Sequence, residues 1–108
     1  MTRTIVESKT KTTVIGFDQP FCVIGERINP TGRKKLAAEL EAGDFSTVEA
    51  DAISQAAAGA SILDINSGAV FSNKMAQDPR YADNNFVEPP LMKELIERVQ
   101  AIVDTPLC

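Results

Sequence analysis

Blocks of apolar residues separated by polar turns predict short strands and helices along the chain. Residues 3 to 7 and 12 to 15 are rich in Thr, Ile and Val and are joined by a short polar tract, which predicts a β-hairpin. Residues 21 to 24 are continuously apolar, as in a parallel strand that is covered on both faces. Residues 61 to 65 predict the next strand, and residues 105 to 108 the start of a third.

The segment after the first of these core strands predicts a helix. Residues 33 to 42 are good helix formers, with Leu36 and Leu40 four positions apart on one face and Gly43 just past the end.

Residues 69 to 90 show no clear periodicity, and segments of that length in a compact domain are usually functional or disordered.

Two further helices are expected on either side of that segment. Ser46 and Glu49 match a capping box at the start of one helix, and Gly59 ends it. Its apolar stripe consists of Val48, Ala52, Ile53 and Ala56. Pro89 and Pro90 suit the first turn of the last helix. Its apolar positions are Leu91, Leu95, Ile96, Val99, Ile102 and Val103.

The order of elements, in which parallel strands alternate with helices, is typical of α/β folds. With 108 residues the chain amounts to one domain, whereas a closed eight-stranded α/β barrel needs roughly 250 residues. The 44% of hydrophobic and 24% of charged residues are ordinary for a globular domain. We therefore expect about two βα units and the opening of a third.

Composition also bears on the class of function. The net charge of −4 argues against a nucleic-acid surface. The sequence has no apolar run of about 18 residues and no signal-peptide core, so we expect a cytoplasmic protein without membrane contact. Histidine is absent, and Cys22 and Cys108 are too few for a structural zinc site, so we expect no bound metal and two free thiols.

Polar side chains follow both predicted core strands where each is expected to end. Glu26, Arg27 and Asn29 follow the first strand, and Asp64 and Asn66 close the second. The carboxyl ends of parallel strands share one edge of the sheet, where α/β proteins bind ligands. A carboxylate accepts hydrogen bonds and an amide both donates and accepts them, so the group suits a heterocycle with adjacent N–H and C=O groups.

Structural roles for the same residues remain open from the sequence. Glu26 and Arg27 could form an internal ion pair that fixes the strand end. Asn29 precedes a proline and could be a turn residue. Asp64 and Asn66 could serve the fold alone, and no residue is assigned a catalytic role.

Two motifs give a resemblance to a known family. The stretch Gly25-Glu-Arg-Ile-Asn-Pro-Thr-Gly32, followed by Leu63-Asp-Ile-Asn-Ser-Gly68, resembles the start of the pterin-binding (β/α)8 barrels. The match is closest to the methyltetrahydrofolate:corrinoid methyltransferases and the folate domain of cobalamin-dependent methionine synthase. Dihydropteroate synthase is more distant. Residues 21 to 108 would be part of such a barrel domain, and residues 1 to 20 a hairpin extension.

The resemblance implies that methyltetrahydrofolate is the substrate and that cobalamin arrives on a separate corrinoid protein. It places Asn29, Asp64 and Asn66 at or beside the pterin pocket, with Glu26 and Arg27 shaping its floor. In the family, the third strand continues past the point matching Cys108 into an aspartate that binds the pterin. We therefore expect this portion to be inactive alone. Its few parallel strands leave an open sheet edge, so we also expect it to form homo-oligomers. The alternatives are a dihydropteroate synthase-like condensing enzyme and a non-catalytic piece of a split barrel.

Overall fold

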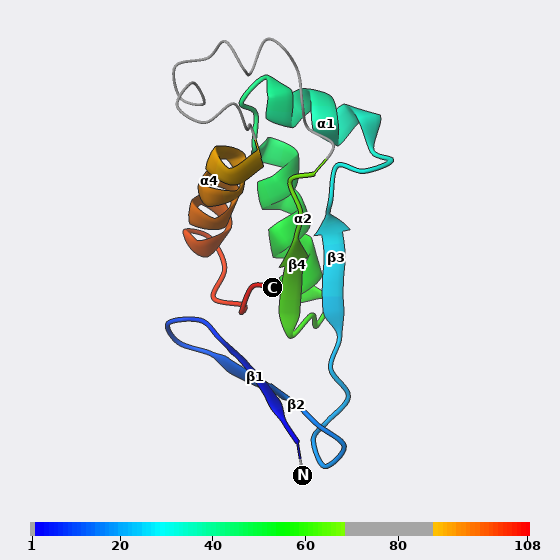
Figure 1. Cartoon of the computed structure of the whole chain (residues 1–108), viewed down its shortest axis with the longest axis vertical. Helices are drawn as coiled ribbons and strands as arrows, with labels where there is room; N and C mark the ends of the chain where they lie inside the picture. Colours follow the sequence, from blue (N-terminus) through cyan, green and yellow to red (C-terminus); the bar gives the residue numbers. More distant parts are fainter. Residues whose placement is uncertain (1, 69–87) are drawn as a thin grey trace.

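The computed structural model describes residues 2–68 and 88–108. In this part of the chain it shows a mixed α/β domain with two small sheets and three helices (Figure 1). The elements in chain order are β1 (Thr4–Glu7), β2 (Thr12–Ile15), β3 (Ile24–Ile28), α1 (Lys34–Glu41), α2 (Ser46–Ala57), β4 (Ile62–Ile65) and α4 (Glu88–Gln100). The α/β class expected from the sequence is confirmed.

The second sheet is parallel, as the order of elements predicted. β3 pairs with β4, and an isolated bridge joins Leu63 of β4 to Leu107. The amide N–H of Cys108 donates to the carbonyl oxygen of Leu63 at 2.8 Å, and the carbonyl oxygen of Cys108 accepts from the amide of Ile65 at 2.9 Å. The end of the chain thus lies beside β4 in the manner of a third parallel strand, which confirms that prediction.

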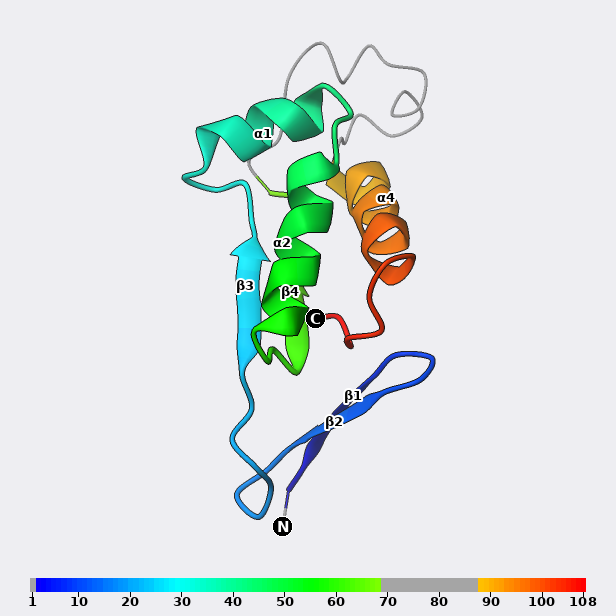
Figure 2. The same cartoon turned by 180° about the vertical axis from the view of Figure 1, so that it is seen from behind.

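The helices α2 and α4 cover one face of the parallel sheet, and no helix of the described residues covers the other face (Figures 1 and 2). The buried cluster on the covered side joins both strands to all three helices. It consists of Ile28, Leu36, Leu40, Phe45, Val48, Ala52, Leu63, Ile65, Leu91, Leu95 and Val99. Ile62 is buried as well but lies outside this cluster.

The amino-terminal hairpin is confirmed and lies at the amino-terminal end of the parallel sheet (Figure 1). β1 and β2 are antiparallel, with Ile5 opposite Val14. The hydroxyl of Thr13 donates a 2.8 Å hydrogen bond to the carbonyl oxygen of Ser61, just before β4. The hairpin therefore leaves the opposite, carboxyl end of the sheet open for other contacts.

The helices α1 and α2 end at the glycines that predicted their ends in the sequence. At the end of α1 the amide of Gly43 donates to Leu40 and that of Asp44 donates to Glu39. This is the Schellman pattern, and Gly43 has a φ of +78°. The end of α2 repeats the pattern at Gly59, whose φ is +102°.

The first core strand differs from its prediction. It spans Ile24–Ile28 rather than residues 21 to 24, so Gly25 does not end it and Glu26 lies within it. Phe21 is 94% exposed, so this segment is not covered on both faces. The physical reason is pairing: β4 begins at Ile62, which is opposite Ile24, and residues before that point have no ladder to join.

The capping box expected at the start of α2 is also wrong. The Oδ1 atom of Asp44 accepts from both the amide (2.9 Å) and the hydroxyl (2.6 Å) of Ser46. Glu49 instead lies 3.7 Å from the guanidinium of Arg98 on α4. The carboxylate of Asp44 thus accepts hydrogen bonds at the start of α2, where the serine oxygen was expected to be the acceptor.

We expect the Asp44 contact to make stability depend on pH. The hydroxyl and then the amide of Ser46 lower the pKa of Asp44 below its ordinary value of 3.8. A lowered pKa in the folded state adds stability above the unfolded pKa, and this contribution is lost as pH falls through the folded value. Urea unfolding at pH 6 and pH 3 should therefore show a smaller loss for Asp44→Asn than for the wild type. Equal losses would contradict this role for Asp44.

Two positions of the expected helical stripes are exposed. Ile53 on α2 is 53% exposed and Ile102 is 40% exposed, because α4 ends at Gln100 and α2 presents Val48 and Ala52 to the core. The other predicted stripe residues Leu91, Leu95 and Val99 are buried. Most of the segment expected to be irregular, 69–87, lies outside the described residues.

Among the described helices, none has the length and apolar character needed to cross a membrane.

Candidate ligand-binding site at the carboxyl edge of the sheet

A one-residue β-bulge shapes the carboxyl end of β3. Gly25 is opposite Leu63 and Ile28 is opposite Ile65, so three steps along β3 match two steps along β4. Bulges of this kind bend a strand and redirect its side chains, often beside active sites. The bulge brings Ile28 to the helix-covered face together with Ile65, which the strict alternation of a regular strand would not do.

Two asparagines follow the paired strands at this edge. The amide of Asn66 donates to the carbonyl oxygen of Ile28 at 2.9 Å, so the register places Asn29 and Asn66 side by side just beyond the strands. The Oδ1 atom of Asn29 accepts from the amide of Thr31 at 3.0 Å, and that of Asn66 accepts from the amide of Gly68 at 2.7 Å. Both are therefore turn residues, the structural role that the sequence left open for Asn29.

These turns use only the side-chain oxygen of each asparagine. Among the described residues, no acceptor lies within hydrogen-bond distance of either side-chain NH2 group. Both side chains are partly buried. Within the described part of the chain, the two side-chain N–H groups of each asparagine are therefore left for a ligand while its oxygen fixes the following loop.

Asp64 lies between two core residues of β4 and therefore projects from the face that carries no helix. Its neighbours Leu63 and Ile65 both belong to the helix-side cluster, and successive side chains in a strand alternate between faces. Asp64 is partly buried, and no side chain in the described ranges pairs with its carboxylate. A carboxylate in an apolar strand is costly unless a donor reaches it, so the position favours a bound group with N–H donors.

Glu26 and Arg27 separate onto opposite faces. Gly25 faces Gln55 of α2, so its neighbour Glu26 leaves from the same face as Asp64 and is exposed. Arg27 instead turns toward α2, where its Nε atom lies 3.8 Å from Asp51. The ion pair considered from the sequence is thus made by Arg27 with Asp51 rather than with Glu26.

The sequence reading missed three residues that support the site. Asp51 and Gln55 on α2 and Arg33 before α1 surround the backbone of the bulge. The only sequence signal for them is that Asp51 and Gln55 are polar and four positions apart on one face of a helix.

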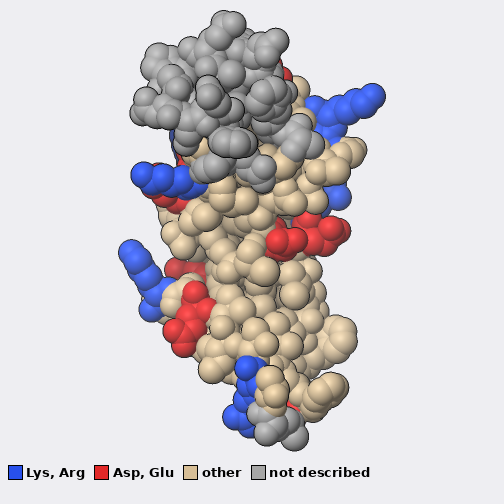
Figure 3. Space-filling view, in the orientation of Figure 1, with Lys and Arg blue, Asp and Glu red and all other residues tan. Residues whose placement is uncertain are grey.

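The charges on the helix-free face of the sheet are gathered in its upper part. In Figure 3, which has the orientation of Figure 1, a group of Asp and Glu side chains lies over the upper part of the sheet, and the middle of the face below it is uncharged. The arrangement at its upper edge therefore combines one partly buried carboxylate and two side-chain amides with an uncharged surface below them. Such a surface suits one flat, polar heterocycle.

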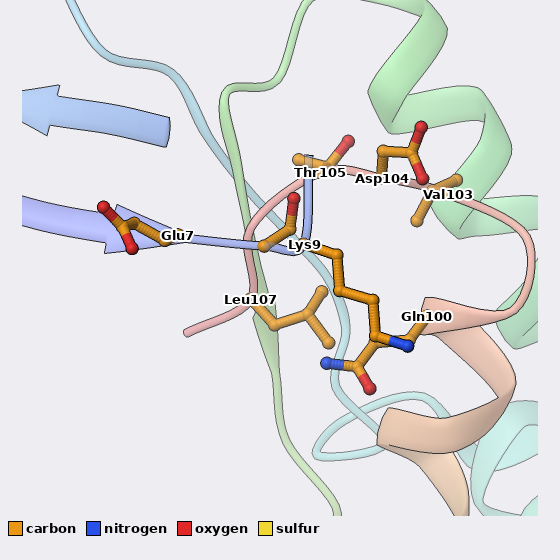
Figure 4. Close-up of a pocket in the computed structure, with 8 residues that line it drawn as sticks. Glu7, Lys9, Gln100, Val103, Asp104, Thr105 and Leu107 are labelled. Carbon is orange, nitrogen blue, oxygen red and sulfur yellow. The ribbon is translucent and has the colours of Figure 1, made fainter. Parts of the chain in front are cut away.

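A separate hollow of about 170 Å³ lies at the other end of the sheet (Figure 4). It lies between the hairpin, at Glu7 and Lys9, and the segment after α4, at Asp104 and Leu107. Its charged groups are of both signs and do not favour one ligand charge. We therefore place the candidate site at the carboxyl edge.

Neither protein-family models nor curated protein sequences give a match to this chain. The family resemblance thus rests on the two sequence motifs alone.

Proposed function

We propose that the chain is the amino-terminal portion of a pterin-binding (β/α)8 barrel of the methyltetrahydrofolate:corrinoid methyltransferase type. Methyltetrahydrofolate binds at the carboxyl edge of β3 and β4, and cobalamin arrives on a separate corrinoid protein. The chain itself holds the pterin and is inactive in methyl transfer when alone.

One observation carries this proposal. The two motifs, 25–32 and 63–68, end side by side at one edge, where no described side chain pairs with Asp64 and no described acceptor takes the side-chain N–H groups of Asn29 and Asn66. A pterin ring carries an amino group and ring N–H beside a carbonyl oxygen and ring nitrogens. Asp64 can accept from the first set and the asparagines can donate to the second.

The topology supports the barrel assignment. Parallel neighbours with helices on one side only match an arc of a barrel wall, whose helices lie outside and whose inner face meets other strands. Below the acidic group at its upper edge, the helix-free face is uncharged in its middle, as the inner face of a barrel would be (Figure 3). Several exposed apolar residues would be covered by further barrel strands or by a second copy of the chain, which agrees with the proposed homo-oligomer: Ile5, Phe17, Phe21, Val23 and Ile24.

The role of these residues in methyl transfer is to position the substrate. Holding the ring in one orientation converts a bimolecular encounter into a reaction between fixed partners. Hydrogen bonds that Asn29 and Asn66 donate and Asp64 accepts would set which edge of the pterin faces the incoming cobalt. Glu26 on the same face adds negative charge at the margin of the site.

Isothermal titration with three ligands tests the proposal. We expect binding of 5-methyltetrahydrofolate, weaker binding of a hydroxymethyl-dihydropterin pyrophosphate, and no binding of p-aminobenzoate. The physical reason is that the edge has donors and acceptors for the ring but no described basic residue facing a pyrophosphate. Preference for the pyrophosphate would favour the dihydropteroate synthase-like alternative, and binding of neither pterin would contradict the proposed function.

A further inference from the structure

Three side chains, which we call the clamp, hold the bulge of β3 against α2 and the start of α1. They are Arg33, Asp51 and Gln55. The clamp lies on the helix-covered side, so its members are separate from the residues that face the proposed ligand.

The clamp satisfies both backbone groups of Arg27. The amide of Arg27 donates to Oε1 of Gln55 at 3.0 Å, and its carbonyl oxygen accepts from Nη1 of Arg33 at 2.6 Å. A bulge removes such groups from the strand ladder, and an unpaired backbone group is costly. Side chains from two helical segments therefore replace the missing ladder partner.

Asp51 fixes the other two members of the clamp and is the least exposed charged group in it. Its Oδ2 atom accepts from Nη1 of Arg33 at 2.8 Å, and its carbonyl oxygen accepts from Nε2 of Gln55 at 3.2 Å. The Asp51 side chain is 15% exposed and that of Arg33 is 28% exposed. A charge-assisted hydrogen bond with this degree of burial is stronger than a surface ion pair.

Gly25 allows this close approach. A Cβ atom at Gly25 would lie 2.6 Å from Oε1 of Gln55 and 2.9 Å from Cδ2 of Leu63. Gln55 can thus lie against the strand only because position 25 has no side chain.

The clamp acts two residues away from a ligand-facing side chain. The carbonyl oxygen of Arg27, which Arg33 holds, also accepts from the amide of Asn29 at 2.8 Å. Asn29 then fixes the loop through Thr31. The backbone of Asn29, and with it the position of the side-chain amide, is therefore held by residues on the helix-covered side of the sheet.

We propose that Arg33, Asp51 and Gln55 are positioning residues that hold the bulge so that Asn29 can donate to the bound pterin. This inference rests on the proposed function for the identity of the ligand, but its structural part can be measured without any ligand.

The test compares Asp51→Asn with Glu49→Gln in the 108-residue chain. Both variants remove one negative charge from α2, but Glu49 pairs only at 3.7 Å with Arg98, away from the bulge. Gln55→Met is a second variant, which removes the acceptor for the Arg27 amide and keeps a similar shape. Readouts are hydrogen exchange at the Arg27 amide, the NMR shifts of the Asn29 side-chain amide, and Kd for 5-methyltetrahydrofolate.

We expect Gln55→Met to speed exchange at the Arg27 amide about tenfold, and both Asp51→Asn and Gln55→Met to shift the Asn29 side-chain signals and raise Kd about tenfold. Exchange at the Leu63 amide, which bonds Pro106 in the core, should stay unchanged, and Glu49→Gln should match the wild type. A loss of binding with this core signal unchanged separates positioning from general destabilisation.

Three outcomes overturn the inference: unchanged Arg27 exchange, unchanged Asn29 signals, or altered signals with unchanged Kd. If the wild type does not bind 5-methyltetrahydrofolate, the proposed function fails. The exchange and Asn29 signals then still decide whether the clamp holds this loop.

Discussion

Asp64→Ala is expected to weaken binding of 5-methyltetrahydrofolate by about 1 to 3 kcal/mol, roughly 5- to 150-fold in Kd. Asp64 is partly buried on the helix-free face and has no partner among the described side chains. Its removal would leave N–H donors of the ligand without an acceptor at a site that excludes part of the solvent. Isothermal titration of both proteins measures the change.

Asp104→Ala is the matched control for this experiment. Asp104 is exposed at the opposite end of the sheet, so its removal changes the net charge equally without touching the candidate site. We expect its Kd to equal that of the wild type. If Asp64→Ala binds as well as Asp104→Ala while its circular dichroism is unchanged, Asp64 has no part in the site.

Leu63→Ala is expected to lower the free energy of unfolding by about 2 to 5 kcal/mol. Leu63 is fully buried in the cluster beneath α2 and α4, and its backbone joins β4 to the segment at Leu107. Truncation removes transfer energy and leaves a cavity that the paired strands on both sides cannot close. Urea unfolding followed by circular dichroism gives the difference.

Ile53→Ala provides the comparison for that measurement. Ile53 fits the apolar stripe in the sequence, yet it is 53% exposed on α2. We expect a change within about 0.5 kcal/mol, because the side chain is largely in solvent and alanine favours the helix. A cost at Ile53 as large as at Leu63 would mean that the helix packs differently from the structure described above.

The sequence predicted best those elements whose signals are local. Leu36 and Leu40 gave the buried face of α1, and Gly43 gave its end, because helical spacing and positive φ depend on nearby residues. The start of β3 could not be predicted this way. It is set by the position of Ile62 on the partner strand, and pairing between distant segments leaves no local mark. The start of α2 at Ser46 was predicted, but its capping box was not formed, because Asp44 accepts from the hydroxyl of Ser46 and the amide of Glu49 donates to the carbonyl oxygen of Phe45.

In the candidate site, too, the features that follow from strand order could be predicted, whereas the contacts between distant segments could not. The motifs placed Asn29, Asp64 and Asn66 at one edge because residues at the carboxyl ends of adjacent parallel strands must lie together. Glu26 and Arg27 lie on opposite faces because β3 extends past Gly25 and successive side chains alternate, and that extension is set by pairing with β4 and not by a local signal. Asp51 was missed because its partner lies on another element and is far away in the chain.

An NMR titration of the 15N-labelled chain with 5-methyltetrahydrofolate tests the central claim most directly. If the pterin binds at the carboxyl edge, shifts should concentrate at the amides of Asn29, Asp64 and Asn66, with the signals of Lys9 and Gln100 at the opposite hollow unchanged. Saturable shifts at those three residues are the expected result. Shifts that concentrate at the hollow, or no shifts at any concentration reached, would contradict the account.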